Sequence, residues 1–549
     1  MKRVTLLAAV AACAPAWKHT PHDQLFQTEH RRGLIRSPQD SPEADWWNRG
    51  EMLFVRPLGR ALSPGTYVKA LLGGPPARDV NRLGQVPDSP WFENRISRRN
   101  YSVQEVFDGA AGDTGFAPGE LSVISGKIDG VSAGFVVRDT AGQVWYLKLD
   151  HPGFPQISTS AETIASRLLW LAGYRVPSMK AFDVDRGRFV LDPKAHMKDR
   201  YSRSVPMTPA YLAELLANTN PDLENRIRVL MSRQAKGKVL GPFDYRGQRV
   251  DDRNDTIPHE HRRSLRALWL FAAWVNNTDT RSNNTLDMFV PLAPDGSGIV
   301  EHYLIDFGDS FGATGLGEKA LKEGWEYLLD WPVVITNLFG FGLRTPDYEH
   351  AKRSPLRSVG LFESKVFDPT SWKPGLPNPA FDQRTSADLF WAASILARIQ
   401  AEHVRAAVGA GSYKEEGAAE YVVATLLERR QKLLEYGFGT FLELDRPRGA
   451  GLTLRLDDLR VLGGLTHQGE IQYVVRWNRT RAFDVELASG SVPANTPELS
   501  IDLTQAIAAR RGDFGDDPFI TVLLKRHGRQ LEVHLRVSAD RVIPVAVER

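Results

Sequence analysis

Residues Asn276 to Asn284 read Asn-Asn-Thr-Asp-Thr-Arg-Ser-Asn-Asn. This stretch comes straight after residues 264–275, an apolar run that predicts a buried helix. A second acidic motif, Leu-Ile-Asp-Phe-Gly at residues 304–308, ends a short strand-like run. Together the two motifs supply an Asp, an Asn five positions later, and a further Asp that leads into Phe-Gly.

Upstream of these motifs, three short segments alternate as hairpin strands do, at residues 121–125, 134–137 and 144–149. Between the first two lie Gly126, Lys127 and Gly130. Glycines at these places would let backbone N–H groups approach a phosphate closely. Their spacing matches neither the GxGxxG nor the Walker A pattern, so this loop alone does not identify a phosphate site.

A lysine and a glutamate follow in neighbouring elements. Lys148 stands among large apolar residues in the third predicted strand. Residues 160–173 are predicted to form a helix, because their apolar residues recur at helical spacing and Gly173 is a natural helix end. Glu162 would lie in the first turn of that helix, where it could reach Lys148. The alternative is that this carboxylate only complements the helix dipole.

The order of these features along the chain resembles the protein-kinase-like superfamily over roughly residues 120–440. The chain is more similar to atypical kinases, such as HipA-type kinases, spore-coat CotH kinases and secretory-pathway (Golgi) kinases, than to ordinary Ser/Thr kinases. Asn277 stands where an ordinary kinase has the histidine of HRD, and no Ala-Pro-Glu motif follows Asp306 at a plausible distance. The glycine loop also departs from the usual pattern.

The resemblance implies an α+β, two-lobed fold and phosphoryl transfer from ATP or another nucleotide, with Mg²⁺ or Mn²⁺. Asp279 would orient the acceptor hydroxyl and take its proton, while Arg281 would offset charge on the transferred group. Asn284 and Asp306 would bind the metal through hard oxygen ligands.

The same resemblance implies that Lys148 neutralises phosphate charge and that Glu162 fixes its direction. Gly126, Lys127 and Gly130 would line the nucleotide phosphates. Asp309 would be a spare carboxylate near the metal, but we expect it instead to cap the turn after Gly308. The alternative for the whole set is that Asp, Asn and Gly simply mark loops.

The N-terminus suggests a membrane address. A short basic start is followed by the apolar residues 4–12, and Val-Ala-Ala-Cys at residues 10–13 resembles the lipobox of bacterial lipoproteins. That resemblance implies cleavage before Cys13, lipidation of its thiol and anchoring on a membrane surface. The apolar run is too short to span a bilayer, which takes about 20 residues. A plain secretory signal and a cytosolic N-terminus are the alternatives. Ala14 would favour the outer membrane of a Gram-negative cell.

Composition limits the remaining possibilities. Cys13 is the only cysteine, so lipidation would leave none for a disulfide, and a core must provide the stability. Apolar residues make up 42% of the chain, which is enough to build one. The formal charge of +3 would fall to +1 on removal of residues 1–12, because Lys2 and Arg3 would be lost. Such a balance gives no reason to expect nucleic-acid binding.

The length of 549 residues argues for several domains. We expect a signal peptide at 1–12, a linker and irregular N-terminal wrap at 13–110, a kinase-like N-lobe at 111–235, a helical C-lobe at 236–445 and a β-sandwich-like accessory domain at 446–549. In the wrap, Trp91 and Phe92 are expected to pack inside the fold. In the C-lobe, helices are predicted at 386–407 and 415–436, and His259 and His261 are expected to be solvated rather than metal ligands.

Six short alternating segments predict the C-terminal β domain, at 452–461, 470–477, 482–488, 498–503, 519–526 and 530–537. They contain no cluster of catalytic residue types, which indicates an accessory or binding role.

Two functions are compatible with these patterns. The first is a membrane-anchored extracytoplasmic kinase that phosphorylates a protein or small-molecule hydroxyl. The alternative is a catalytically inactive kinase-like lipoprotein that binds an envelope partner or ligand. Retention of Lys148, Asp279, Asn284 and Asp306 favours the kinase. The scarcity of ATP outside the cytoplasm favours the binding protein.

Overall fold

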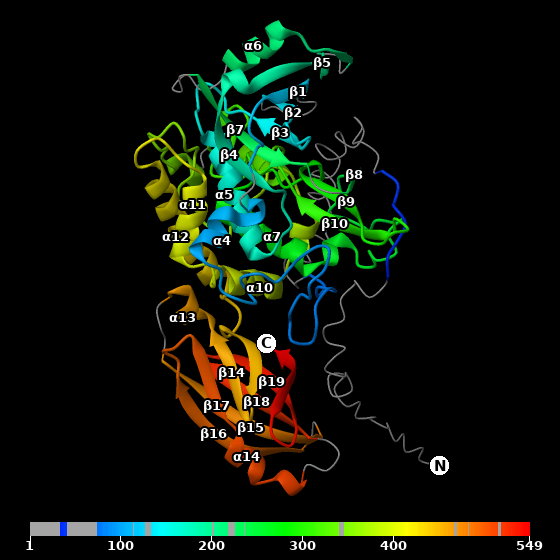
Figure 1. Ribbon diagram of the computed structural model, residues 1–549. Coiled ribbons are helices and arrows are strands. Elements are labelled where there is room, and N and C mark those ends of the chain that lie inside the picture. The colour runs from blue at the N-terminus through cyan, green and yellow to red at the C-terminus, as the bar shows by residue number, and fades with distance from the viewer. Residues whose placement is uncertain are drawn as a thin grey trace, which may run out of the picture. The chain divides into compact units, whose positions relative to one another are not determined.

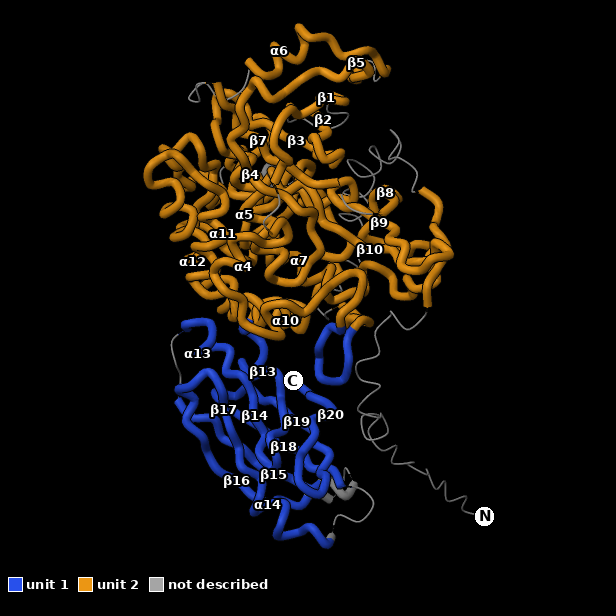
Figure 2. Tube along the Cα trace, in the orientation of Figure 1, with its two compact units in different colours: residues 1–28, 80–87, 438–549 blue, residues 29–79, 88–437 orange. Residues whose placement is uncertain are grey.

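The computed structural model describes residues 33–40, 74–112, 115–126, 133–199, 203–217, 225–234, 237–339, 345–465, 469–480, 483–513 and 518–549. These residues fall into two compact units of mixed α and β structure, which confirms the α+β class. One unit comprises 80–87 and 438–549, and the other holds the rest (Figure 2). The predictions for Cys13, Lys127 and Gly130 lie outside the described residues.

The N-terminal half of the larger unit is built on one sheet (Figure 1). Its described strands, in the spatial order β4-β7-β3-β2-β1-β5-β6, are β1 Leu121–Gly126, β2 Gly134–Arg138, β3 Val144–Lys148, β4 Met179–Asp185, β5 Phe189–Lys198, β6 Ser204–Pro206 and β7 Arg226–Arg233. Alternating residues such as Val123, Val137 and Leu147 are buried in its core, as the sequence pattern predicts. Because β3 pairs with both β2 and β7, Lys148 at its end is held from two sides.

The helix α5 (Ile157–Ala172) packs against α4 (Val103–Asp108) and α11 (Ala401–Ala410), and nearly all of it is buried. Its first turn is capped by the Asp150 carboxylate, which accepts hydrogen bonds from the backbone N–H groups of Ser158 and Thr159 at 2.9 Å each. The helix therefore begins three residues before the predicted start at Ser160. Glu162 lies in the second turn, so a role as a first-turn dipole partner is wrong.

The rest of the larger unit is mainly helical and carries a small sheet in the order β10-β9-β8. The strands of this sheet are β8 Lys238–Gly241, β9 Thr285–Pro291 and β10 Gly298–Leu304, while β11 Ala313–Thr314 and β12 Gly317–Glu318 form a separate two-stranded sheet. The helices of this part are α7 Arg263–Val275, α8 Trp331–Phe339, α9 Pro379–Asp382, α10 Ser386–Leu396, α11 and α12 Ala418–Gly437, with the single turns η7 His259–His261, η8 Ser282–Asn284 and η9 Asp347–His350. On the sheet side of this unit lie α6 Pro209–Ala217, η5 Gly109–Ala111 and η6 Arg186–Arg188.

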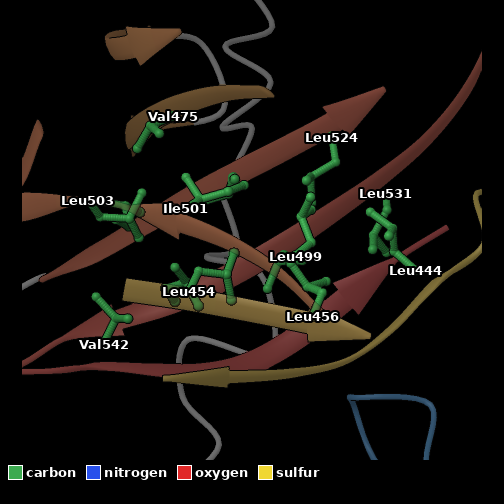
Figure 3. Close-up of a cluster of buried hydrophobic side chains, with 14 of the residues drawn as sticks. Leu444, Leu454, Leu456, Val475, Leu499, Ile501, Leu503, Leu524, Leu531 and Val542 are labelled. Carbon is green, nitrogen blue, oxygen red and sulfur yellow. The ribbon is translucent and has the colours of Figure 1, made fainter. Parts of the chain in front are cut away.

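The smaller unit contains two antiparallel sheets, in the orders β13-β14-β17 and β16-β15-β18-β19-β20. Its elements are β13 Leu444–Ala450, β14 Thr453–Asp458, α13 Leu459–Gly463, β15 Glu470–Thr480, β16 Phe483–Pro493, β17 Glu498–Asp502, α14 Thr504–Ala508, η10 Arg511–Asp513, β18 Phe519–Arg526, β19 Arg529–Val537 and β20 Val542–Glu548. Leu454 and Ile501 from the first sheet share one apolar core with Val475 and Leu524 from the second (Figure 3). Two sheets closing over one core form a sandwich.

Several element boundaries differ from the predictions. The helix predicted at 386–407 is broken after α10, because Gln400 starts a new helix through a reciprocal capping interaction with His403. The strand predicted at 452–461 ends at Asp458, whose carboxylate accepts the N–H groups of Arg460 and Val461 and so begins α13.

The N-terminal segment before the sheet is tightly packed. Phe92 is fully buried against Tyr174 and Trp391, and Trp91 stacks on His302 with ring centroids 3.5 Å apart. Both aromatic residues therefore pack inside the fold, as predicted. Among the described residues, no helix combines the length and the apolarity that crossing a bilayer requires.

Candidate active site

Three charged side chains from β3, α5 and the segment after β10 meet at one point. The Lys148 ammonium lies 2.9 and 2.8 Å from the two carboxylate oxygens of Glu162 and 2.7 Å from Oδ1 of Asp306. Burial disfavours the charged ammonium, but the two carboxylates outweigh burial and raise the pKa of Lys148 above its ordinary value. The structure thus brings together three residues that the sequence separates by up to 158 positions.

Gly308 makes this approach possible. A Cβ at Gly308 would lie 2.7 Å from the Ser158 hydroxyl and 3.5 Å from Oε2 of Glu162. Ordinary side-chain contacts are longer than the first of these distances, so any larger residue would push against the start of α5. The Phe-Gly sequence after Asp306 is therefore needed for close packing against α5.

A tight loop follows α7 and carries Asp279. Asn276 ends the helix in the left-handed region, with φ 54°. The side chain of Asn277, the residue that replaces the expected histidine, then accepts the backbone N–H of Asp279 at 3.1 Å. The Asn284 amide nitrogen donates to the backbone carbonyl of Asp279 at 2.8 Å. Asp279 is held by hydrogen bonds from both sides of the loop.

The hairpin of β9 and β10 brings Asn284 beside Asp306. Thr285 pairs with Leu304 in the antiparallel register, and the N–H of Ile305 donates to the carbonyl of Asn284 at 3.0 Å. Asp306 is the next residue and adopts φ 58°, a left-handed conformation that is uncommon for a side chain other than glycine. Such an outlier, held in place by its surroundings, is typical of functional positions.

The donor atoms at this end of the hairpin fit a hard divalent cation. Because the Asn284 amide nitrogen is used by Asp279, its amide oxygen points the opposite way and is available as a ligand. The Asp306 side chain is 49% exposed, so a cation can reach its carboxylate. Amide and carboxylate oxygens are ligands that suit Mg²⁺ and Mn²⁺.

Arg281 contacts Asp279. Its guanidinium forms a forked pair with the Asp279 carboxylate, with N–O distances of 2.8 and 3.0 Å. The predicted role of Arg281, offsetting charge on a transferred group, would require this side chain to leave the carboxylate. Arg281 is 44% exposed, which leaves it room to do so.

Gly126 ends β1, and its missing Cβ has a local packing explanation. A Cβ there would come 3.1 Å from that of Met197 on β5. Glycine at this position accommodates the neighbouring strand, and a role for its N–H group with phosphate stays a prediction.

Asp309 was identified from the sequence as a carboxylate near the metal motif, with a turn cap as its expected role, whereas Lys319 was not identified. Among the described residues the Asp309 carboxylate makes no capping hydrogen bond, so the predicted turn cap is wrong. Its pKa is raised to about 6, mainly by burial and also by the nearby carboxylates of Asp279, Asp306 and Glu323, against the lowering effect of Lys319. These mutual effects place Asp309 close to the other acidic groups of the site.

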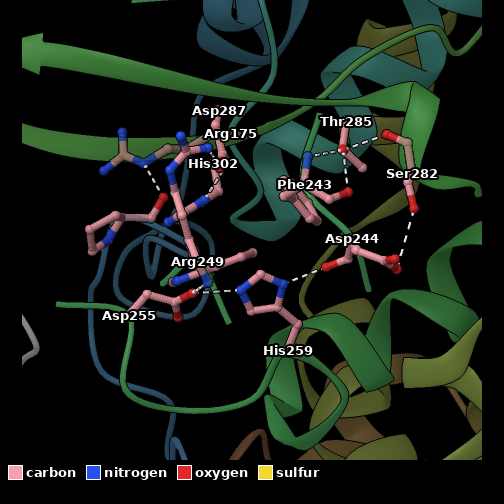
Figure 4. Close-up of polar contacts among 12 residues, drawn as sticks. Arg175, Phe243, Asp244, Arg249, Asp255, His259, Ser282, Thr285, Asp287 and His302 are labelled. Carbon is pink, nitrogen blue, oxygen red and sulfur yellow. Dashed lines mark hydrogen bonds and ion pairs between the residues drawn. The ribbon is translucent and has the colours of Figure 1, made fainter. Parts of the chain in front are cut away.

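Polar contacts beneath the hairpin connect the site to the interior (Figure 4). The Thr285 hydroxyl accepts the N–H of Phe243 at 2.9 Å and donates to the carbonyl of Ser282 at 2.6 Å. Across the hairpin, His302 pairs with Asp287 at 2.6 Å. These contacts fix both ends of the segment that carries Asn284.

His259 belongs to the same buried network. It is only 3% exposed and contacts the Asp255 carboxylate at 2.7 Å, which also binds Arg262 at 2.7 Å. The prediction that His259 is solvated is therefore wrong. The hydrogen bonds of the Asp255 carboxylate to His259 and Arg262 satisfy the polar groups that burial takes away from water.

Comparisons with known proteins add little to this geometry. No protein-family model matches the chain, and no curated protein matches it. A solved structure described as the crystal structure of the Golgi casein kinase matches with 10% sequence identity and a TM-score of 0.24, over 73% of this chain and 97% of that chain. A TM-score this low carries no argument about fold or function. The function must therefore be inferred from the contacts of the site residues.

Proposed function

We propose that the chain is an atypical kinase that transfers the terminal phosphoryl group of ATP, or another nucleoside triphosphate, to a hydroxyl group with Mg²⁺ or Mn²⁺. The observation that carries the proposal is the bonding of Lys148 to both Glu162 and Asp306, beside a loop that presents Asp279 and Asn284. The Glu162 carboxylate is aimed at Lys148 although Glu162 is only 2% exposed. Loops that contain Asp, Asn and Gly for structural reasons alone would not need such a buried carboxylate.

In this proposal the larger unit adopts a kinase-like two-lobed fold. The sheet β1–β7 with α5 corresponds to the N-lobe predicted at 111–235, and the helices from α7 to α12 correspond to the C-lobe predicted at 236–445. Lys148 and Glu162 come from the first part, and Asp279, Asn284 and Asp306 come from the second.

The chemistry needs positioning and charge neutralisation more than covalent catalysis. Asp279 orients the acceptor hydroxyl and takes its proton as the acceptor oxygen bonds to the terminal phosphorus. The bond from that phosphorus to the bridging oxygen breaks, which leaves a phosphorylated acceptor and a nucleoside diphosphate. Lys148 neutralises phosphate charge, while Asn284 and Asp306 hold the cation. The cation supplies positive charge to the phosphate oxygens.

We also propose that the protein acts at a bacterial cell envelope, anchored through a lipid on Cys13, with the outer membrane favoured. The lipobox-like residues 10–13 support this address. The acceptor would then be an envelope protein or a small molecule that carries a hydroxyl group.

A first test is calorimetric titration of ATP, with Mg²⁺ or Mn²⁺, into protein that begins after Cys13. We expect metal-dependent binding with a dissociation constant between about 1 μM and 1 mM, the range of enzyme affinities for their substrates. Asp306→Ala removes a cation ligand and should abolish the metal dependence.

The matched control for this titration is Asp295→Ala. Asp295 is exposed in the turn at the opposite end of the same hairpin, so its loss should leave binding unchanged. If correctly folded wild-type protein binds no nucleotide with either metal, the kinase proposal is wrong.

One observation favours the alternative of an inactive binding protein. The forked pair with Arg281 occupies the Asp279 carboxylate, the proposed base. Nucleotide binding without phosphate release or transfer would support this alternative, whereas turnover would exclude it.

A further inference from the structure

Lys319 follows β12 and is fully enclosed, with 1% of its surface exposed. Its ammonium donates to the backbone carbonyl of Asn276 at 2.9 Å, to the Thr278 hydroxyl at 2.7 Å and to the backbone carbonyl of Asp309. An ammonium has three N–H donors, and these three oxygens match them. A buried lysine is costly unless all of its donors are satisfied in this way.

The three acceptors belong to two segments of the candidate site. Asn276 and Thr278 flank Asn277, whose side chain accepts the N–H of Asp279. Asp309 lies in the segment that begins with Asp306. Lys319 therefore links the loop that presents the proposed base to the segment that presents a proposed cation ligand.

The lysine is itself firmly placed. Its backbone N–H donates to the carbonyl of Gly312 at 2.8 Å, and the same carbonyl accepts the N–H of Leu361 at 3.2 Å. The short β11–β12 hairpin precedes it directly. A side chain held at its own backbone can fix the position of the loop that it contacts.

We propose that Lys319 is a positioning residue for phosphoryl transfer, which holds the loop of residues 276–279 so that Asp279 faces the acceptor hydroxyl. The inference rests on the proposed function and adds a residue outside both acidic motifs. Two of the three acceptors of Lys319 lie on the loop of residues 276–279, and its described contacts do not reach Lys148 or Glu162, so its effect should fall mainly on turnover and less on nucleotide affinity.

The test compares Lys319→Met with wild-type protein in two measurements on the full chain. Calorimetry with Mn²⁺ and ATP gives the affinity, and release of phosphate or its transfer to the chain's own hydroxyls gives turnover. We expect affinity within about threefold of wild type and turnover lowered about 100-fold, because a displacement of about 1 Å costs roughly that factor. Lys322→Met, at an exposed lysine three residues away, is the matched control and should change neither value.

Because a buried lysine is replaced, a second pair of variants tests the same contact more gently. Thr278→Val removes one acceptor with little change of shape and should lower turnover about tenfold, as expected for one hydrogen bond to a charged group. Thr278→Ser restores the hydroxyl and should recover most of that loss. General destabilisation would not separate Val from Ser in this way.

The outcomes distinguish the two proposals. If the wild-type protein turns over, and Lys319→Met and Thr278→Val turn over equally fast, the proposed role of Lys319 is wrong and the kinase proposal stands. Equal losses of affinity and turnover in these variants also overturn it. Wild-type protein that does not bind ATP, or binds it without turnover, overturns both.

Discussion

At Asp309, an acidic side chain lies in a site already crowded with negative charge. Its raised pKa, about 6, means that the folded protein disfavours the ionised carboxylate. As the pH rises from about 4 to 6, the unfolded chain ionises this group first, so the free energy of unfolding falls. Below about pH 4 the group is protonated in both states and costs nothing.

We therefore predict that Asp309→Asn stabilises the protein above pH 6 by up to about 3 kcal/mol, at about 1.4 kcal/mol per pKa unit. It should have little effect at pH 4. Urea unfolding at pH 4 and pH 8 measures the difference. Asp347→Asn, at an exposed carboxylate, is the control, and a gain at pH 4 as large as that at pH 8 would contradict the prediction.

Single residues could be predicted when their immediate neighbours in sequence carried the signal. Lys148 in an apolar strand and Asp306 before Phe-Gly were identified in this way, and the structure joins them. Lys319 could not be identified, because its acceptors lie at residues 276, 278 and 309 and meet only in the fold. A lysine near glycines otherwise predicts a solvated loop.

Among the elements, α5 carries Glu162 and is fixed by one arginine. Arg228 of β7 is 3% exposed and donates to the hydroxyls of Thr159 and Ser160 at 2.8 and 3.0 Å. It also donates to the carbonyl of Gly411, just after α11. The Arg228 side chain thus connects the sheet to α5 and to the C-terminal end of α11.

We predict that Arg228→Met destabilises the larger unit by about 1–3 kcal/mol, because the buried hydroxyls of Thr159 and Ser160 lose a charged hydrogen-bond donor. Hydrogen exchange should show faster exchange in α5 than in wild type. Arg226→Met, at the exposed start of the same strand, should leave that exchange unchanged. Unaltered protection of α5 in Arg228→Met would mean that α4 and α11 hold the helix without it.

Periodicity predicted strands that have one clearly buried face, such as β1 and β3, and a continuous apolar run predicted α7, which is buried on all sides. It missed β13 and β20, which contain Pro447 and Pro544 and lie at the ends of their sheets. Proline is tolerated in such edge strands, but in a sequence it argues against a strand. The pairing of β19 with β20 also shifts next to Pro544, which breaks the alternation.

For the molecule as a whole, the proposed anchor gives a localisation test. In bacteria that process lipoproteins, wild-type protein should be found in the membrane fraction and should incorporate labelled fatty acid. Cys13→Ser should abolish labelling and release the protein from the membrane, because no thiol remains to be acylated. Ala14→Ser keeps the cysteine and serves as the control. Wild-type protein without label would contradict the anchor.

The division into units was only partly visible in the sequence. The change to short alternating segments after residue 445 indicated a β domain, and the structure contains a sandwich there. The inclusion of residues 80–87 in the same unit could not be predicted, since Val-Asn-Arg-Leu-Gly-Gln-Val-Pro has no strand or helix periodicity.

That inclusion has a consequence for biosynthesis. The N–H of Val547 in β20 donates to the carbonyl of Arg82 at 3.0 Å, so this part of the sandwich unit joins two ends of a long stretch of chain. At about 5–20 residues per second, the ribosome needs on the order of half a minute or more to make the residues between them. Throughout that time the early segment lacks its partner strand, so this part of the sandwich unit can close only when synthesis of the chain is almost finished.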